Sequence, residues 1–521
     1  MRRLRVPLRF PGEAVMLNVN GGQAGILCGV AVSATARRIV PLLLVFLSML
    51  GGCAVGPDFA RPATSAEAGY RTAPVTLPSA GSTDPQQHLQ AGGEIVSQWW
   101  TLFRSDELDS TLSLAIAQNP TLDTARATLA QAQQAILVAR GGYFPQVDLG
   151  AGAERARVST GAFEKAVHAS GTLFSIGPTV SYSVDLFGRV RREVEENTAL
   201  ADVQRYALAA AWLTLTGNAV NTAITSASAR EQLRAVQDII AVDQRNVDLV
   251  EIERSAGKAA RTDVLAAQSQ LAADVALLPP LKQQLSAAHD ALAILVGKTP
   301  AQWAAPRFDF DMLALPVAVP VTLPSDLVRA RPDILAAEAQ LHAASAAIGV
   351  ATAQLYPSIT LSASWTQEAG SMGPLFDEAN GLWSVAAGLT APLFHGGALK
   401  AQRQAAVDAF DAQLGIYRET VLAAFGQVAD TLKALQHDAE ELAAQRTALD
   451  AAQASLALSQ ESYKVGAASL LDVLQAQRLY AQARLGYAKA RGQRYLDTAQ
   501  LFEATGGGWQ ASVASSTAPA P

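Results

Sequence analysis

The sequence predicts a mixed α+β membrane protein made of two copies of one unit, in which strands cross a bilayer and long helices form a rod or tube. Three features predict this fold class: an internal repeat, runs of strict apolar–polar alternation, and long proline-free segments with a seven-residue hydrophobic repeat. Hydrophobic residues make up 50% of the 521 positions and charged residues 17%, a balance that excludes a disordered chain.

The internal repeat emerges when the chain is shifted against itself. A shift of 212 residues places Asn119-Pro120 on Arg331-Pro332, and a shift of 209 places Gly257 on Gly466. Because this period is far longer than the repeat of a solenoid, it indicates a duplicated domain. Each copy is expected to run as helix, strand, strand, long helix, turn and long helix.

Four segments have the period-two pattern of strands with one apolar face. The first segment starts at Val147, and the other three span residues 174–186, 358–366 and 383–393. Their second face is rich in Ser, Thr and Gly, which indicates a polar lumen, and Pro178 is expected to lie near a strand end. A spanning barrel must close and needs at least about eight strands, so several chains must contribute to one barrel.

The helical segments are unusually long. Proline is absent from Thr179 to Leu278 and again from Leu393 to Ala518. At ~1.5 Å per residue, helices over 190–253 and 398–461 would each be ~96 Å long. In the second of these helices a mostly apolar residue recurs every seven positions, a spacing that predicts a left-handed supercoil. These residues are Val421, Val428, Leu435, Leu442, Leu449, Leu456 and Tyr463.

The N-terminus has the pattern of an export signal. Arg37 and Arg38 precede the apolar stretch Ile39–Leu50, which is short for a spanning helix. Leu50-Gly51-Gly52-Cys53 is similar to the cleavage box of bacterial lipoproteins, in which the cysteine receives a diacylglyceryl group and palmitate and becomes the new N-terminus. Cys53 is therefore the expected lipid-attachment residue, and Ala54 favours the outer membrane; the alternative is an ordinary signal peptide with a chance cysteine. The length of 1–36 suggests a start codon assigned too far upstream.

These patterns divide the chain into five parts. They are a lipoprotein signal peptide (1–52), a lipid-anchored extended segment (53–98), a first repeat (99–304), a second repeat (305–505) and a tail expected to be disordered (506–521).

Composition and motifs argue against several other classes of protein. Residues 1–52 carry six arginines and one glutamate, so the remainder has a net charge of −11, which is unfavourable for binding nucleic acid. The only cysteines are Cys28 and Cys53, which excludes a disulfide framework in the body. Gly297-Lys298-Thr299 imitates the end of a phosphate-binding loop, but Leu292 stands where that motif needs glycine. The six histidines lack ligand spacing, so neither catalysis nor a metal site is expected, and Trp99-Trp100 is expected to pack in the core.

The chain resembles the TolC-like outer-membrane efflux factors, in the NodT/OprM-like lipoprotein branch that serves resistance-nodulation-division (RND) pumps. The matching motifs are Cys53-Ala54-Val55-Gly56-Pro57-Asp58-Phe59, Trp99-Trp100, Asp185-Leu186-Phe187-Gly188-Arg189, Arg331-Pro332-Asp333, Tyr356-Pro357-Ser358, Pro392-Leu393-Phe394 and Tyr463-Lys464-Val465-Gly466. The resemblance implies a homotrimer with a twelve-stranded barrel in the outer membrane, four strands from each chain, continued by a helical barrel in the periplasm. It also implies two partners, a periplasmic adaptor protein and an inner-membrane RND pump.

Glycines mark the expected strand–helix joints. Gly188 in the first repeat, and Gly396 with Gly397 in the second, each follow a strand and precede a long helix, where a sharp change of direction needs unusual φ values. The family usually has Asp where His395 stands, so a cap made by that Asp is not expected here.

A second pair of glycines, Gly257 and Gly466, is expected at the turns of two helical hairpins. In the family these tips, which include Val465, face the periplasm, dock on the adaptor and constrict the pore. The resemblance therefore implies a periplasmic gate formed by Asp472, its repeat mate Asp263, and Tyr463.

Two departures from the family pattern affect this gate. Gln475 and Ala468 stand where some members of the family carry an acidic residue and an arginine. The gate would therefore hold fewer charged residues in this chain. The alternative is that Asp472 has no part in a gate and is an acidic residue at the start of a helix, where the positive end of the helix dipole stabilises it.

The sequence as a whole predicts a passive exit duct of a tripartite efflux system, which conducts small molecules to the exterior and needs no cofactor besides the lipid on Cys53. One alternative is the exit duct of a type I secretion system. Another is a lipid-anchored periplasmic coiled-coil scaffold without a pore, for which the amphipathic strands would be unnecessary.

Overall fold

The computed structural model describes residues 54–63, 87–93, 96–160, 167–321 and 324–510. The predicted leader, the lipid-attachment residue Cys53 and residues 511–521 of the predicted tail lie outside these ranges. Everything below concerns the unit that begins at Cys53.

The duplication is visible in helix lengths. Helices α3 (Pro120–Gly141) and α8 (Pro332–Ala353) each have 22 residues, and α4 (Arg189–Ser255) and α9 (Ala398–Lys464) each have 67. At ~1.5 Å per residue the longer pair spans ~100 Å. The predicted long helices are thus confirmed to within a few residues at each end.

The start of α3 shows why the Asn-Pro pattern begins a helix. The Asn119 side chain accepts a hydrogen bond from the N–H of Thr121 at 2.8 Å, and Pro120 occupies the first turn, where no intrahelical N–H is needed. In the second repeat Pro332 has the same place in α8, and Arg331 forms an ion pair with Asp333 at 2.7 Å.

The last helix differs between the repeats. In the second repeat α10 (Leu470–Ala504) is continuous, whereas in the first it is divided into α5 (Arg261–Val275) and α6 (Leu278–Leu295). The expectation of one long helix was wrong here because Pro279 and Pro280 have no N–H to donate and are tolerated only in the first turn of a new helix. Two helical stretches, Arg261–Leu295 and Pro332–Ala353, are long and apolar enough to span a membrane by length and composition, although most of the second is buried within the fold.

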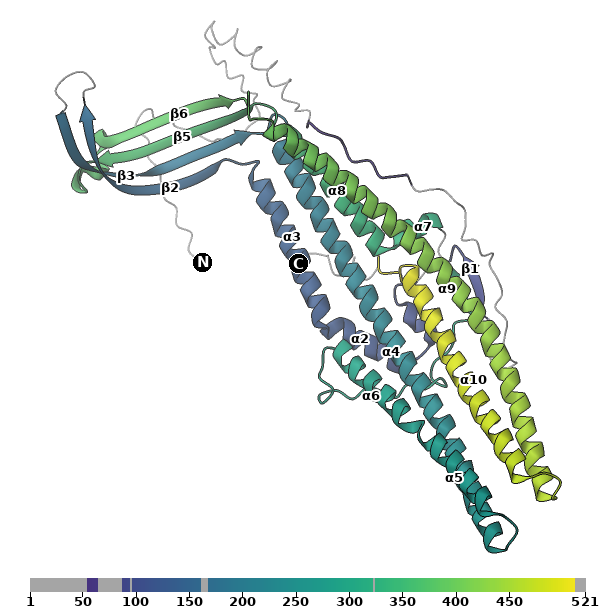
Figure 1. Cartoon of the computed structure of the whole chain (residues 1–521). Helices are drawn as coiled ribbons and strands as arrows, with labels where there is room; N and C mark the ends of the chain where they lie inside the picture. Colours follow the sequence, from purple (N-terminus) through teal and green to yellow (C-terminus); the bar gives the residue numbers. More distant parts are fainter. Residues whose placement is uncertain (1–53, 64–86, 94–95, 161–166, 322–323, 511–521) are drawn as a thin grey trace, which may run out of the picture. The chain divides into compact units, whose positions relative to one another are not determined.

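Four strands form one antiparallel sheet in the order β2-β3-β5-β6. They are β2 (Gln146–Thr160), β3 (Val167–Val184), β5 (Ser358–Ala369) and β6 (Gly381–Thr390). Two short 3₁₀ turns, η2 (Gly373–Phe376) and η3 (Glu378–Asn380), connect β5 to β6. The register places the start of β2 beside the end of β3, and the start of β5 beside the end of β6. All four connections to helices therefore leave from one end of the sheet, and the hairpin turns of α4–α5 and α9–α10 lie at the far ends of the helices (Figure 1).

Pro178 lies in the middle of β3 and pairs with Leu149 of β2, so the expectation that it sits near a strand end was wrong. Its missing N–H coincides with a break in the pairing of β3 with β5 between Ile176 and Thr179. At the same point Gly177 allows a close backbone approach, because a Cβ built there would lie 2.0 Å from the carbonyl oxygen of Trp365.

The predicted seven-residue stripe on α9 faces inward. Val428, Leu435 and Leu442 are buried, and Val421, Leu449, Leu456 and Tyr463 are half-buried. Helix α9 as a whole packs mainly against α10 and α8. Because the stripe residues are buried or half-buried, the heptad pattern correctly predicted a packing face of α9.

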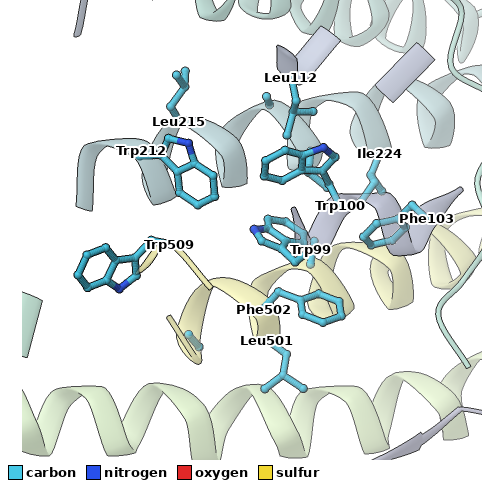
Figure 2. Close-up of a cluster of buried hydrophobic side chains, with 14 of the residues drawn as sticks. Trp99, Trp100, Phe103, Leu112, Trp212, Leu215, Ile224, Leu501, Phe502 and Trp509 are labelled. Atoms are coloured by element: carbon cyan, nitrogen blue, oxygen red, sulfur yellow. The ribbon is translucent and has the colours of Figure 1, made fainter. Parts of the chain in front are cut away.

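The main core lies where both repeats meet η1 (Trp99–Phe103), α2 (Asp106–Gln118) and α7 (Pro324–Ala330). Trp99 stacks on Phe502 of α10 at 5.3 Å between ring centroids, and Trp100 packs on Trp212 of α4 at 5.6 Å (Figure 2). The predicted core role of Trp99-Trp100 is confirmed. Beside this core β1 (His88–Ala91) pairs in parallel with β4 (Ala318–Val321), a pairing that the sequence did not indicate.

The chain stays ordered beyond the predicted start of the tail at residue 506. Trp509 is 6% exposed and belongs to the main core (Figure 2). Its indole N–H donates a hydrogen bond to the carbonyl oxygen of Ala330 at 2.6 Å. The three-glycine turn Gly506–Gly508, all with positive φ, folds the tryptophan back onto the core.

Candidate functional site

The two faces of the sheet differ in chemistry across all four strands. One row of directly paired residues is apolar: Val147, Val180, Ala363 and Val385. The next row is polar: Asp148, Thr179, Ser364 and Ser384. In the polar row the hydroxyl oxygens of Ser364 and Ser384 lie 2.8 Å apart. The sheet therefore separates an apolar environment from a wet one.

Among the described residues, large side chains on the apolar face remain exposed. Trp383 is 77% exposed, Leu149 73% and Leu389 69%. A contiguous apolar surface of this kind is unfavourable in water, and on a sheet with a polar opposite face it suits contact with lipid.

Aromatic residues lie near both ends of the strands. Trp365 and Trp383 are directly paired near one end of β5 and β6. Near the helical end, Phe187 stacks on Tyr356 at 4.7 Å between ring centroids. Aromatic residues near both ends of the strands are typical of membrane barrels, which carry aromatic girdles at both interfaces.

Strands β2 and β6 form the two edges of the sheet. Within the described ranges each pairs with one strand only, so a row of backbone N–H and C=O groups remains open on its outer side. Such open edges are not tolerated in lipid, where no water can satisfy them.

The predicted strand–helix joints lie where the chain passes from sheet to helix. Gly188 has φ 76° and precedes α4, and Gly397 has φ 85° and precedes α9, with Gly396 at φ 56° before it. In the first joint the Asp185 carboxylate accepts a hydrogen bond from the N–H of Arg191 at 3.0 Å. At the N-cap residues of α4 and α9, Gly188 and Gly397, no side chain of the described residues makes a capping hydrogen bond.

The two hairpin turns have the same backbone geometry. Gly257 and Gly466 both have φ 75°. Gly257 donates to the carbonyl of Arg254 at 3.0 Å, and the following N–H donates to a carbonyl five residues back at 2.8 Å. Gly466 repeats this pattern at 3.0 and 2.8 Å, and the pattern is the Schellman motif that ends helices. Val465, beside it, is 77% exposed at the tip.

Both predicted gate acids cap the helix that follows the turn. The Asp472 carboxylate accepts hydrogen bonds from the backbone N–H of Ser469 at 2.8 Å and from its hydroxyl at 2.6 Å. These bonds hold the pKa of Asp472 below its ordinary value. Asp263 accepts one bond, from the N–H of Ala260 at 2.8 Å. The structure therefore shows a helix-start role for both acids, and their place in a gate stays a prediction.

Tyr463 connects the two hairpins close to their tips. Its hydroxyl on α9 donates a hydrogen bond to the carboxylate of Glu253 on α4. Burial, and then the bond to Glu253, raise the pKa of Tyr463 to about 12. The sequence did not point to Glu253, because its partner lies 210 residues away in the chain.

Further from the tips, a buried polar cluster joins α4, α5 and α10. The Asp243 carboxylate accepts a hydrogen bond from the amide of Gln477, which in turn accepts one from Asn246. The carboxyl group of Asp274 on α5 lies beside that of Asp243 and accepts a hydrogen bond from Gln270 at 2.8 Å. Burial, and then Asp274, raise the pKa of Asp243 to about 8. Nothing in the sequence singled out this cluster, because its members lie at unremarkable positions of three helices.

Known proteins match almost the entire described chain. The model of the family described as outer membrane efflux protein matches residues 111–298 and 323–507. The pyoverdine export outer membrane protein OpmQ of Pseudomonas aeruginosa is 33% identical over 442 residues, which cover 82% of this chain and 92% of OpmQ. The toluene efflux pump outer membrane protein TtgF of Pseudomonas putida is 29% identical over 88% of this chain and 95% of its own length. The solved outer-membrane channel OprN superposes with a TM-score of 0.80 at 27% identity, over 88% of this chain and all of OprN.

Proposed function

Because this chain belongs to the outer membrane efflux protein family, we propose that three copies assemble into a duct through the outer membrane, continued by helices into the periplasm. The duct would be the passive exit of a tripartite efflux system, with a periplasmic adaptor and an inner-membrane RND pump. It performs no chemistry; the pump supplies the free energy.

The observation that carries this proposal is the open sheet with one lipid-like face and one polar face. A four-stranded sheet with two free edges cannot stand alone in lipid, and closed barrels need at least about eight strands. Pairing β6 of one copy with β2 of the next would satisfy both edges, and three copies would give twelve strands. The Ser- and Thr-rich face would then line the lumen.

The cargo would be small molecules of varied chemistry. Two relatives of similar identity are named for pyoverdine export and for toluene efflux, and these compounds differ greatly in polarity. A lumen lined mainly by small polar side chains suits passage rather than selection. Names that refer to efflux pumps favour this role over type I secretion.

Lipid at Cys53 would anchor each copy in the outer membrane. The support is the sequence of the cleavage box, together with the close approach of Ala54, the residue directly after it, to Gly188. Replacing Cys53 by Ser should abolish labelling with palmitate, and labelling of the Cys53→Ser protein would contradict the anchor.

The tips would form the periplasmic gate. Three copies of Asp472 around one axis would repel one another only weakly in a water-like dielectric, so charge alone cannot hold or open the pore. The bond between Tyr463 and Glu253 ties the second hairpin to the first and would hold the closed arrangement together with the packing of α9. Gly257, Val465 and Gly466 would present the adaptor-docking surface.

Conductance in planar bilayers tests the duct itself. The purified full chain should insert and give uniform single-channel steps, and its assembled form should change migration on heating. A protein that binds lipid but never conducts would support the periplasmic scaffold instead.

Single-channel recording also tests the gate. Tyr463→Phe removes only the hydroxyl that binds Glu253 and should raise the open probability several-fold, while Tyr480→Phe on α10 serves as the matched control. Asp472→Ala should weaken block by divalent cations from the periplasmic side. If Asp472→Ala conducts and is blocked like wild type, Asp472 is only a helix cap.

A further inference from the structure

The residues directly after Cys53 do not leave the protein surface; they cross both repeats. The N–H of Val55 donates to the carbonyl of Phe187 at 3.1 Å, at the end of the first-repeat strands. Gly56, with φ 97°, lies so close to α8 that a Cβ on it would be 2.5 Å from the Cα of Gly349. This extended segment therefore touches the first repeat and the second within two residues.

The same segment continues along α8. The ring of Phe59 stacks on His342 at 4.5 Å between centroids, with planes 16° apart. One turn further toward the start of α8, Arg61 forms an ion pair with Glu338 at 2.7 Å. We call residues Ala54–Arg61 the strap, because they run across α4 and along α8.

Arg192 of α4 lies at the centre of these contacts. Its side chain is 5% exposed. Its guanidinium forms ion pairs with Asp58 of the strap and Glu195 of α4, each at 2.7 Å. It also donates to two strap carbonyls, those of Val55 at 3.3 Å and Gly56 at 3.4 Å.

A buried guanidinium destabilises a fold unless its donors are satisfied. Burial alone lowers the pKa of Arg192, but the hydrogen bonds to Asp58 and Glu195 outweigh burial, and the pKa is raised overall. Gly349 makes room for this arrangement, because a Cβ there would lie 2.7 Å from the Cγ of Arg192. Lysine could not replace Arg192, because an ammonium group lacks the planar guanidinium that reaches two carboxylates and two carbonyls together.

We infer that Arg192 is a positioning residue, which fastens the strap across α4 and α8 and thereby fixes the place of the N-terminal anchor at the strand–helix joint. Ala54 already lies against that joint, because a Cβ on Gly188 would be 2.7 Å from its Cα. Only the statement about the anchor rests on the proposed function; the fastening of the strap stands on its own contacts. Lipid on the preceding residue would thus be held beside the sheet rather than at the end of a free tether.

A spin label on the strap tests this inference in the full-length protein. Ala60→Cys places the label on an exposed strap residue, and its line shape should show slow motion. Arg192→Met should raise the ratio of mobile to immobile label by at least about tenfold, as expected for losing charged, buried hydrogen bonds. Arg189→Met is the matched control, because Arg189 lies on the same helix and pairs with Glu193 rather than with the strap.

Further variants keep the test decisive. Asp58→Ala removes one ion pair from an exposed residue, should not affect folding and should raise the mobile fraction several-fold. Cys53→Ser should leave the strap immobile, because protein contacts hold it. Labelling of the parent protein without Ala60→Cys would reveal an unlipidated thiol, which would overturn the anchor but not the strap. A label that is mobile in wild type, or that stays immobile in both Arg192→Met and Asp58→Ala, overturns the role of Arg192.

Discussion

The two helical hairpins share a backbone design but differ in how side chains stabilise it. Both have a 67-residue first helix and a turn glycine at φ 75°. In the second hairpin, however, the returning helix is continuous and Ser469 completes a cap, whereas in the first Ala260 offers no cap oxygen and Pro279 follows a break. Duplication has thus conserved the geometry that the turn requires and let the local stabilisation diverge.

Each hairpin also holds one buried carboxyl pair between its two helices. Asp243 pairs with Asp274 in the first, and Asp438 with Asp497 in the second. In both pairs burial, and then the partner carboxyl, raise the pKa of one member to about 8. Because each pair belongs to a different hairpin and lies at a different distance from the turn, substitutions in the two pairs report on the stability of the two hairpins separately.

The largest effect is expected from pH. A carboxyl whose folded-state pKa lies near 8 instead of 3.8 stabilises the fold fully below pH 3.8, and this stabilisation is lost as pH rises toward 8. While the folded chain binds one more proton than the unfolded chain, stability falls by about 1.4 kcal/mol per pH unit. Asp243→Asn and Asp438→Asn should each flatten the pH dependence of the urea midpoint between pH 5 and 8.

The exposed Asp248→Asn on α4 is the control for these two variants. A midpoint that depends on pH as steeply in Asp243→Asn as in wild type would show that Asp243 is ionised in the folded protein. Unequal flattening by Asp243→Asn and Asp438→Asn would show that the hairpins differ in burial as well as in capping.

An intermediate effect is expected at the turns. Gly257→Val and Gly466→Val would each force a β-branched residue to φ 75°, at a cost of about 1–2 kcal/mol. Because no heavy atom lies within 4 Å of a Cβ at either site, the cost is backbone strain alone and should be equal in both hairpins. Heat denaturation measures it, with the milder Gly→Asn change at each site as the control; a difference above ~1 kcal/mol between the hairpins would contradict equal turns.

The smallest effect is expected at the caps. Ser469→Ala should destabilise the second hairpin by about 1 kcal/mol, and Ala260→Ser should stabilise the first by up to a similar amount. Hydrogen exchange of the first turn of α10 and of α5 would report both changes. If Ala260→Ser leaves the exchange of α5 unchanged, the asymmetry between the hairpins has a source other than the cap.

Periodic patterns allowed most of the fold to be predicted from the sequence. The period-two segments became β2, β3, β5 and β6, and the seven-residue stripe became the packed face of α9. The structural effect of a single residue was harder to predict, because it depends on neighbours distant in sequence. Pro178 is an example: it is tolerated within β3 because its missing N–H falls where Gly177 and Trp365 approach closely.

The candidate site was predicted only where backbone conformation decides it. A glycine between two predicted elements indicates a joint or turn that needs a positive φ, and this can be seen in the sequence. Gly188, Gly257, Gly397 and Gly466 all have a positive φ in the structure. Pairwise contacts could not be predicted, because Glu253, Gln477 and Arg192 are ordinary polar residues of long helices until the fold brings their partners to them.

The central claim is that the open sheet of one chain closes only with other copies. Native mass spectrometry of the full chain in mild detergent measures the number of chains in each particle most directly. The account predicts particles of three chains, and retention of the same mass in the gate variant Tyr463→Phe. A particle that conducts in bilayers but contains a single chain would contradict it.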